Sequence, residues 1–407
     1  MATSLMKPAL VLGLLSMIGP FAMDMYLPAM PGIAADLGTS AQAMQGTITV
    51  YLAAFGLAQM VYGPWADQSG RKPPLYVALA IFALGSGICI AAQSVETLTL
   101  GRFVQGLGGA AIMVIPRAII RDMSTGDEAT RLMALIMLVF SVSPMLAPLT
   151  GSALMAIAGW RSVFVSLLLT TLMSLTLLHF AQAETLPPQQ RQKASLGQFY
   201  KGAKVLLRDR GFVTLTLLGT AGMSSFFVFL AAAPFVYVQS FGLTPTQFSL
   251  AFAVNAVAFI GAGQLAGPLG TRFGAMAVMR GAAVLFALAA TVLFALTLGN
   301  LAGLWGLIGL LALGNMGLGL IIPTSMVMAL DDHGEIAGLA SSLGGTFQMI
   351  FGGALVALVG PWLDGSPAPM VGMIALCAWA GLALAFAAPK RQAAAAAARD
   401  TSASAAS

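Results

Sequence analysis

Apolar runs of about the length that crosses a lipid bilayer recur along the whole sequence, and short polar segments separate them. A membrane-spanning helix needs about 20 mostly apolar residues, and helix is required because an irregular backbone exposed to lipid would leave its polar groups unpaired. The pattern therefore predicts an all-α integral membrane protein with twelve transmembrane helices. The expected spans are about 9–28, 46–64, 75–93, 99–119, 132–156, 162–181, 212–236, 247–268, 279–298, 303–328, 337–360 and 370–388.

The longest polar stretch falls in the middle of the chain and leaves six spans on each side. It contains Pro187 and Pro188, which are typical of a linker. A shift of 204 residues places Gly63-Pro64 on Gly267-Pro268, which indicates that the halves are repeats. We predict an N-terminal six-helix half (1–181), a cytoplasmic linker (182–210), a C-terminal six-helix half (211–389) and a disordered cytoplasmic tail (390–407).

Composition supports lipid as the solvent of this chain. Hydrophobic residues make up 58% of the sequence and charged residues only 8%, whereas soluble domains carry about 25% charged residues. The net charge is +5, but the basic residues lie in the gaps between apolar runs and form no aromatic-basic patch. Nucleic-acid binding is therefore not expected.

The basic residues also predict the orientation. With the N-terminus in the cytoplasm, sixteen of the nineteen lysines and arginines are cytoplasmic, as the positive-inside rule requires. Arg161 faces outside, and Arg102 and Arg117 belong to the fourth span. Both termini are then cytoplasmic. No small-x-small cleavage site follows the first apolar run, so we expect no cleaved signal peptide.

Enzyme chemistry and metal binding are not expected. Cys89 and Cys377 lie inside apolar runs, and His179 and His333 are far apart in the sequence, where boundary or loop positions explain them. No clustered nucleophile, set of metal ligands or carboxylate pair is visible.

A glycine-rich turn joins the second and third spans at residues 63–72. Gly63 and Gly70 permit a tight turn and close helix approach. Asp67 can pair with Arg71 or with a helix N-terminus, and Lys72 follows directly. An ordinary positively charged turn is the alternative interpretation.

Arg102 lies inside the fourth span, where a charged residue indicates a functional site. Gln105, Gly106, Gly109 and Met113 follow it at helical spacing, so a polar, small-residue face points into the bundle. Alternatively, the arginine holds helices together by bonding backbone carbonyls.

Asp24 is the one carboxylate well inside a predicted span. Low-dielectric surroundings favour the neutral form of a carboxyl group, so it can take up and release a proton. A cationic substrate or Arg102 could be its partner. Alternatively, Asp24 lies at a helix end and faces periplasmic water.

The fifth span contains Pro144, Pro148 and Gly151, which permit a bend and close packing. A purely structural kink remains an alternative here. Aromatic residues and methionine in the seventh span suit an adaptable apolar pocket, although core or lipid-facing packing explains them too. The candidate substrate-cavity residues are Tyr26, Tyr51, Gln105, Met113, Met223, Phe226, Phe227 and Asn255.

These motifs resemble those of the major facilitator superfamily over about residues 10–388. Residues 63–72 are similar to its G-x-L-A-D-R-x-G-R-K loop, with departures at Trp65 and Gln68. Residues 102–110 are similar to R-x-x-Q-G-x-G-A-A, with Gly109 at the position of the first alanine. The Asp24-x-Tyr-Leu-Pro segment resembles the first helix of the bicyclomycin/chloramphenicol resistance branch of the twelve-helix drug–proton antiporters. Residues 143–152 resemble the antiporter motif G-x-x-x-G-P-x-x-G-G, with three glycines replaced.

The resemblance implies a proton-coupled exporter of drug-like or antibiotic compounds, such as phenicols or bicyclomycin, in the bacterial inner membrane. It implies that residues 63–72 gate the conformational change, that Asp24 and Arg102 couple transport to protons, and that the fifth span favours export. We expect a monomer without cofactor, driven by the proton gradient. The alternative is a proton-coupled transporter of an endogenous metabolite such as a sugar or amino acid, for which few intramembrane polar groups are present.

Overall fold

The computed structural model describes residues 2–123, 126–191, 196–331, 333 and 336–389, and within these residues the fold is helical without strands. Its long helices are α1 (Ala2–Asp24), α3 (Ala41–Ser69), α4 (Lys72–Ala91), α5 (Val95–Met123), α6 (Gly126–Ala158), α7 (Arg161–Ala181), α8 (Leu196–Arg208), α9 (Arg210–Phe235), α10 (Pro245–Phe273), α11 (Ala275–Leu298), α12 (Leu304–Leu330), α13 (Ala337–Val359) and α14 (Pro367–Ala387). Shorter elements are η1 (Leu27–Ala29), α2 (Met30–Asp36), η2 (Pro188–Gln190), the π-helical η3 (Val236–Ser240) and η5 (Gly360–Trp362).

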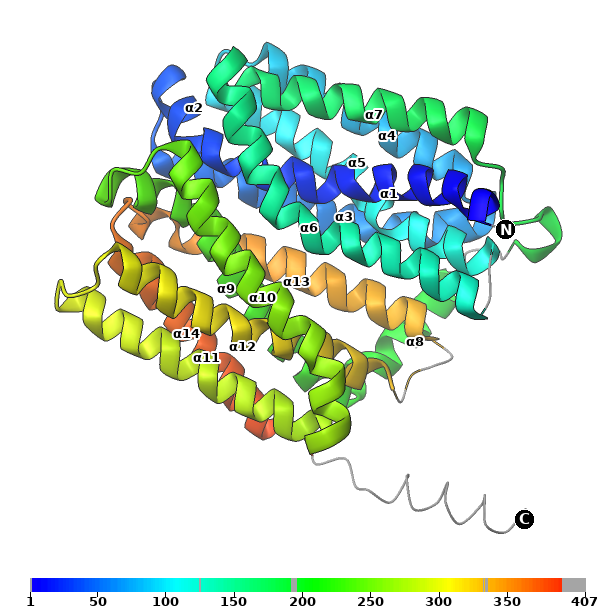
Figure 1. The fold of residues 1–407 in the computed structure, drawn as a ribbon. Coiled ribbons are helices and arrows are strands. Elements are labelled where there is room, and N and C mark those ends of the chain that lie inside the picture. The colour runs from blue at the N-terminus through cyan, green and yellow to red at the C-terminus, as the bar shows by residue number, and fades with distance from the viewer. Residues whose placement is uncertain (1, 124–125, 192–195, 332, 334–335, 390–407) are drawn as a thin grey trace, which may run out of the picture.

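The helices form two groups that lie side by side (Figure 1). Helices α1 to α7 make up one half of the bundle, and α9 to α14 make up the other. Twelve segments in the described residues are long and apolar enough to cross a membrane, which confirms the predicted number of spans. The halves meet mainly where α3 packs against α13 and where α6 packs against α10.

The first span differs from the prediction. It runs from Val11 to Asp36 rather than ending near 28, and it is not one continuous helix. Helix α1 ends at Asp24, and η1 and α2 follow after a two-residue turn. Pro28 and Pro31 contribute to this break because proline has no backbone N–H to donate. The break places Asp24 in the middle of the span.

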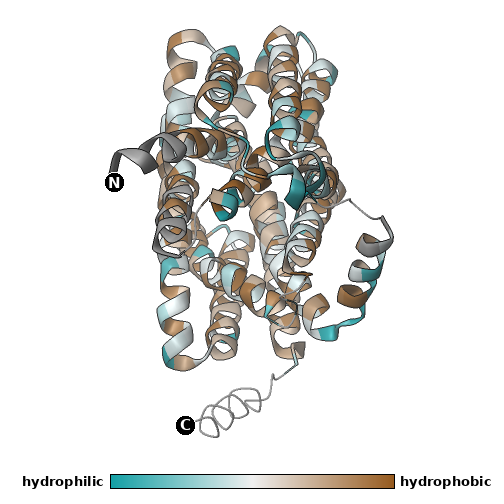
Figure 2. Cartoon of the chain, turned by 90° about the vertical axis from the view of Figure 1, so that its right-hand side faces the viewer, coloured by the Kyte–Doolittle hydropathy of each residue, from teal (hydrophilic) through white to brown (hydrophobic). Residues whose placement is uncertain are grey.

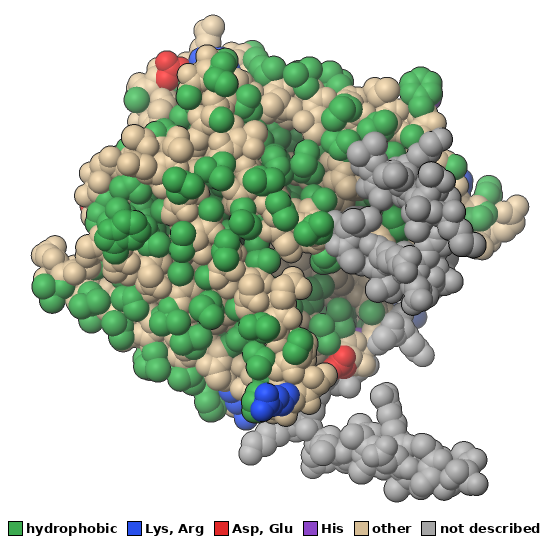
Figure 3. All heavy atoms as spheres, in the orientation of Figure 1, with side chains coloured by type: hydrophobic (Ala, Val, Ile, Leu, Met, Phe, Trp, Pro, Cys, Tyr) green, Lys and Arg blue, Asp and Glu red, His purple; other side chains and the backbone are tan. Residues whose placement is uncertain are grey.

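Apolar side chains cover the outside of the bundle. Figure 3 shows hydrophobic side chains spread over the broad middle of one face, with charged side chains near its edges. Figure 2 shows apolar colour along the helices and hydrophilic colour mainly in connections and helix ends. Ile157 and Phe180 are 83% and 81% exposed. Such exposure is stable only if lipid covers these faces.

The two ends of the bundle carry different polar clusters. We call the end with Arg71 and Glu184 the Arg71 end, and the opposite end, where Arg161 pairs with Asp36 at 3.3 Å, the Asp36 end. Helix α3 runs from the Asp36 end to the Arg71 end, and the long helices that follow it in the first half alternate in direction.

The segment between the halves contains a helix. Helix α7 ends at Ala181 and α9 begins at Arg210, so we keep 182–210 as the proposed linker. Within it, α8 packs against α9 and α13. Residues 192–195 of the linker and the predicted tail, 390–407, lie outside the described residues.

Candidate functional site

Asp24 is a buried carboxylate at the break of the first span. It is 6% exposed and lies at the last residue of α1. Its side chain makes no ion pair or hydrogen bond with another described residue. The carboxyl group is therefore inside the bundle rather than at a membrane surface, and no lysine or arginine in the described ranges forms an ion pair with it.

Arg102 of α5 is the largest fully buried side chain in the described part of the chain. Its Nη1 donates to the Ala22 carbonyl oxygen at 3.1 Å and to Gln105 Oε1 at 2.8 Å. Its Nε and Nη2 are buried without a partner. Buried N–H groups normally find acceptors, so this arginine keeps donor capacity that the described residues do not use.

Two aromatic rings surround the Arg102 guanidinium. Its central carbon lies 4.2 Å from the ring centroid of Tyr51 and 4.7 Å from that of Tyr26. A cation over an aromatic face is stabilised by the ring quadrupole, and more strongly when water is excluded. The Tyr26 hydroxyl bonds Thr47 Oγ1 at 2.7 Å, and Gln105 Nε2 donates to Ser86 Oγ at 2.8 Å.

Asp24 and Arg102 are neighbours but not an ion pair. The described salt bridges, defined by N···O distances up to 4.0 Å, do not include this pair. The connection is through the backbone instead, because Arg102 holds the carbonyl of Ala22, two residues before Asp24. Movement of the α1 end therefore changes the surroundings of both groups at once.

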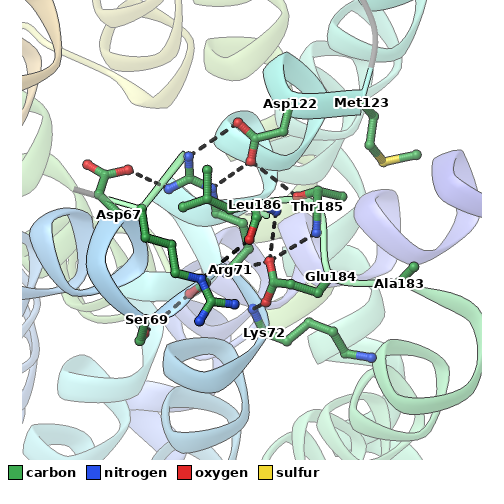
Figure 4. A network of polar contacts seen from close by, with 12 residues as sticks. Asp67, Ser69, Arg71, Lys72, Asp122, Met123, Ala183, Glu184, Thr185 and Leu186 are labelled. Carbon is green, nitrogen blue, oxygen red and sulfur yellow. Dashed lines mark hydrogen bonds and ion pairs between the residues drawn. The ribbon is translucent and has the colours of Figure 1, made fainter. Parts of the chain in front are cut away.

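The glycine-rich turn after α3 carries a network of charges (Figure 4). Arg71 Nη1 donates to Asp67 Oδ1 at 2.5 Å, while Nε and Nη2 donate to the two oxygens of Asp122 at 2.7 and 3.2 Å. Asp122 lies near the end of α5. Asp67 thus pairs with Arg71, one of the two partners considered from the sequence. The bidentate contact fixes α5 against the turn.

Glu184 completes this network from the segment after α7. Its carboxylate accepts from the backbone N–H groups of Arg71 and Lys72 at 2.8 and 3.0 Å, at the start of α4. It also accepts from Thr185 and Leu186. Partial burial alone would raise the pKa of Glu184, but these four N–H donors outweigh it and hold the pKa below its ordinary value. Gly70, with φ of +99°, leaves room for the carboxylate.

The fifth-span motif lies where the halves meet. A Cβ on Gly151 would collide with the backbone of Met25, so glycine permits α6 to approach the break in the first span. Ser152 Oγ lies 2.6 Å from Ser249 Oγ of α10. Ser249 Oγ also lies 3.0 Å from the Pro148 carbonyl oxygen, and Ser152 Oγ lies 3.1 Å from the Pro245 carbonyl oxygen. Each hydroxyl has one proton, so it donates to one of these acceptors at a time. Pro144 and Pro148 lie within α6, which remains one helix.

The predicted cavity residues fall into separate clusters. Tyr26, Tyr51 and Gln105 surround Arg102, as described above. Asn255 instead accepts from Asn315 at 3.0 Å inside the C-terminal half, and Phe226 stacks on Phe259 at 6.0 Å. Phe227 is buried against Gly352 of α13. Met113 and Met223 are half-buried, and no described contact joins all eight residues into one pocket.

Sequence reasoning missed four residues that the structure places in these networks: Asp122, Glu184, Ser152 and Ser249. Asp122 and Glu184 lie 51 and 113 positions from Arg71. A hint was present for Asp122, because an acidic residue at the end of the span stands among basic neighbours. Ser152 stands at the last position of the motif at residues 143–152, but nothing in the sequence pattern indicated its contact with α10, and Ser249 gave no signal at all.

The family model of the Major Facilitator Superfamily matches residues 12–357 of the chain. The chain belongs to the major facilitator superfamily. Among solved structures, a bacterial homologue of the human lysosomal transporter Spinster, in an inward-facing and unoccupied conformation, has a TM-score of 0.73 at 16% identity. That match covers 95% of this chain and 96% of the other, and it supports the superfamily fold.

Curated superfamily relatives match at higher identity. An uncharacterized transporter of the superfamily from Bacillus subtilis, YdgK, is 33% identical over 86% of this chain and 88% of its own length. A bicyclomycin resistance protein homolog from Haemophilus influenzae is 30% identical over 90% and 92%. A chloramphenicol resistance protein from Pseudomonas aeruginosa is 30% identical over 88% and 83%.

Proposed function

We propose that this superfamily member is a proton-coupled exporter of drug-like small molecules that works by alternating access. The proposal of drug export rests on the match to relatives named for bicyclomycin and chloramphenicol resistance, which covers most of both chains. A sugar or amino-acid transporter of the same fold is less well supported, because those relatives are named for drugs.

Asp24 is the proposed proton carrier. A carboxyl group that is buried at mid-span without a cationic partner can hold a proton in one conformation and release it in another. Arg102, joined to the same helix end through the Ala22 carbonyl, is the positioning residue. The proton gradient supplies the energy, and the proposed protein is a monomer that needs no cofactor.

Residues 63–72 are the proposed conformational gate. The charge network of Arg71 holds the ends of α3, α4 and α5 together, and breaking it would release them. In the proposed orientation this end and both termini lie in the cytoplasm of a bacterial cell, and the positive-inside rule supports that orientation. Hydrogen bonds between the halves lie toward the Asp36 end and in mid-bundle in the described residues, which supports a state closed on the outside.

The function is tested by drug susceptibility in an efflux-deficient bacterium that expresses the wild type or Asp24→Asn. The panel contains phenicols, bicyclomycin, sulfonamides and lipophilic cations. We expect resistance with the wild type and its loss in the variant at equal membrane expression. Resistance to no compound would contradict drug export, whereas resistance unchanged by Asp24→Asn would contradict the proton site alone.

A further inference from the structure

Arg117 is a second arginine within the fourth span, and its surroundings differ from those of Arg102. It lies in α5, directly after Pro116. Its Nε is buried without a hydrogen-bond partner. Within the described residues its side chain forms no ion pair and no hydrogen bond, and the Phe140 ring on α6 lies 5.3 Å from its guanidinium carbon. Its charge is therefore not neutralised by a described group.

Arg280 provides a direct comparison within the same molecule. It lies five residues after the start of α11, whereas Arg117 lies six residues before the end of α5. It too stands 5.3 Å from a phenylalanine ring, that of Phe386. Its donors are occupied, however, because Nε and Nη2 bond the carbonyls of Ala385 and Ala388 at 3.1 and 3.3 Å. Arg280 thus binds α14 through its side chain, whereas no described carbonyl or carboxylate accepts a hydrogen bond from the side chain of Arg117.

Arg117 lies on the face of α5 that is turned toward the interior of the first half. Gly109, Met113 and Arg117 follow one another at intervals of four residues and so share a helix face. A Cβ on Gly109 would touch the Tyr51 hydroxyl and the Phe55 ring, so this face looks toward α3. At 1.5 Å per residue, Arg117 lies roughly 22 Å along the axis from Arg102 and roughly 9 Å from the Arg71 end of the helix.

We propose that Arg117 binds an anionic group, such as a carboxylate, sulfonate or phosphate, on compounds that enter the transporter from the Arg71 end. A guanidinium can offer two parallel N–H donors that match such groups. The guanidinium carbon of Arg117 lies 5.3 Å from the Phe140 ring centroid, and its buried Nε–H has no acceptor among the described residues. This proposal rests on the proposed export function and adds to it a substrate class, amphiphilic anions. Arg117 is a binding residue separate from the Asp24 and Arg102 pair.

The phosphate of an anionic lipid has the same chemistry as the proposed ligand. The experiment therefore measures binding to the full-length protein in nanodiscs of phosphatidylcholine alone and in nanodiscs that also contain phosphatidylglycerol. The probes are two matched pairs, nalidixic acid and fusidic acid with their methyl esters, and binding is measured by microscale thermophoresis. The variants are Arg117→Gln, Arg117→Lys and, as the matched control, Arg280→Gln.

We expect the wild type to bind at least one acid more tightly than its ester. Arg117→Gln should weaken binding of that acid at least tenfold while changing binding of the ester less than twofold. Arg117→Lys, which keeps the charge but loses the planar pair of donors, should give an intermediate affinity. Arg280→Gln should leave the preference for the acid unchanged. A preference that disappears in Arg280→Gln as well would reflect general loss of structure and overturn the proposal.

Other outcomes also overturn it. These are a wild type without preference for any acid, equal weakening of acid and ester in Arg117→Gln, or unchanged binding of the acid together with loss of stabilisation by phosphatidylglycerol. The last result would assign Arg117 to a lipid phosphate. Resistance of wild-type cells to chloramphenicol, a neutral drug, is scored separately, so failure of the anion site and failure of drug export remain distinguishable.

Discussion

The guanidinium carbon of Arg102 lies 4.2 Å from the ring centroid of Tyr51, while the Tyr51 hydroxyl is buried and has no hydrogen-bond partner in the part of the chain that the structure describes. The aromatic face, and not the hydroxyl, is thus what this tyrosine offers to the cation. A buried arginine without a carboxylate partner depends strongly on such contacts, because its charge is otherwise costly in a low-dielectric interior.

Tyr51→Phe and Tyr51→Leu should therefore behave differently. Phenylalanine keeps the aromatic face, so we expect transport close to that of the wild type. Leucine removes it, at a cost of about 1–2 kcal/mol of stability, and should slow proton-driven transport in proteoliposomes at least tenfold. Equal transport by the two variants would show that the ring is not needed.

Asp122 should matter more than Asp67 for the charge network. Asp122 receives two N–H donors from Arg71, and its side chain is 17% exposed, whereas Asp67 receives one and is 57% exposed. Exposed ion pairs contribute little because water screens them. We expect Asp122→Asn to lower the thermal unfolding midpoint more than Asp67→Asn, measured by intrinsic fluorescence. The reverse order would contradict this ranking.

Glu184→Gln should destabilise the protein in a pH-dependent manner. Because folding lowers the pKa of Glu184 from its ordinary value of 4.5, its stabilising effect is complete above that value and is lost as pH falls through the folded-state pKa. The variant should melt about 2–4 °C lower at pH 7. The difference from the wild type should shrink as pH drops below about 4.5, and a constant difference at all pH values would contradict the role of the charge.

Ser249→Ala should loosen the contact between the halves. It removes the Ser249 hydroxyl, which lies within hydrogen-bond distance of Ser152 Oγ and of the Pro148 carbonyl. A hydroxyl has one proton to donate, and loss of such a hydrogen bond costs about 1 kcal/mol. Spin labels on Ile157 and Leu250, both exposed, should therefore report a larger population with a wide distance between α6 and α10.

Ser225→Ala is the matched control for that measurement. Its hydroxyl bonds the Gly222 carbonyl within α9, so its loss leaves the interface intact. Ser249→Ala with a distance distribution identical to that of Ser225→Ala would show that the serine pair does not hold the halves together.

Much of the fold could be predicted because hydropathy alone determines where a chain can cross lipid. The number of spans is confirmed, and the buried positions of Asp24, Arg102 and Gln105 agree with a polar interior. The roles assigned to these residues stay predictions. The helix break after Asp24 could not be predicted from hydropathy, because an apolar run has the same hydropathy whether or not its helix is continuous.

The contacts among polar residues could not be predicted, because each depends on which helix ends meet. Glu184 reaches the start of α4 from a distant part of the chain, and Ser152 reaches Ser249 across the two halves. Neither residue is unusual in its local sequence. Periodicity assigns a residue to a helix face, but the partner on the opposing face depends on tertiary packing.

Glu184 and Lys72 join the segment after α7 to the start of α4, because the Glu184 carboxylate accepts from the backbone N–H of Lys72. Lys72 Nζ also donates to the Gln182 carbonyl at 2.6 Å, so the chain up to Leu186 is fastened to the first half, while α8 packs against the second. Only the nine residues 187–195 connect these anchors, and nine residues reach at most about 30 Å. The length of this connector therefore sets an upper limit to the separation of the two halves at the Arg71 end.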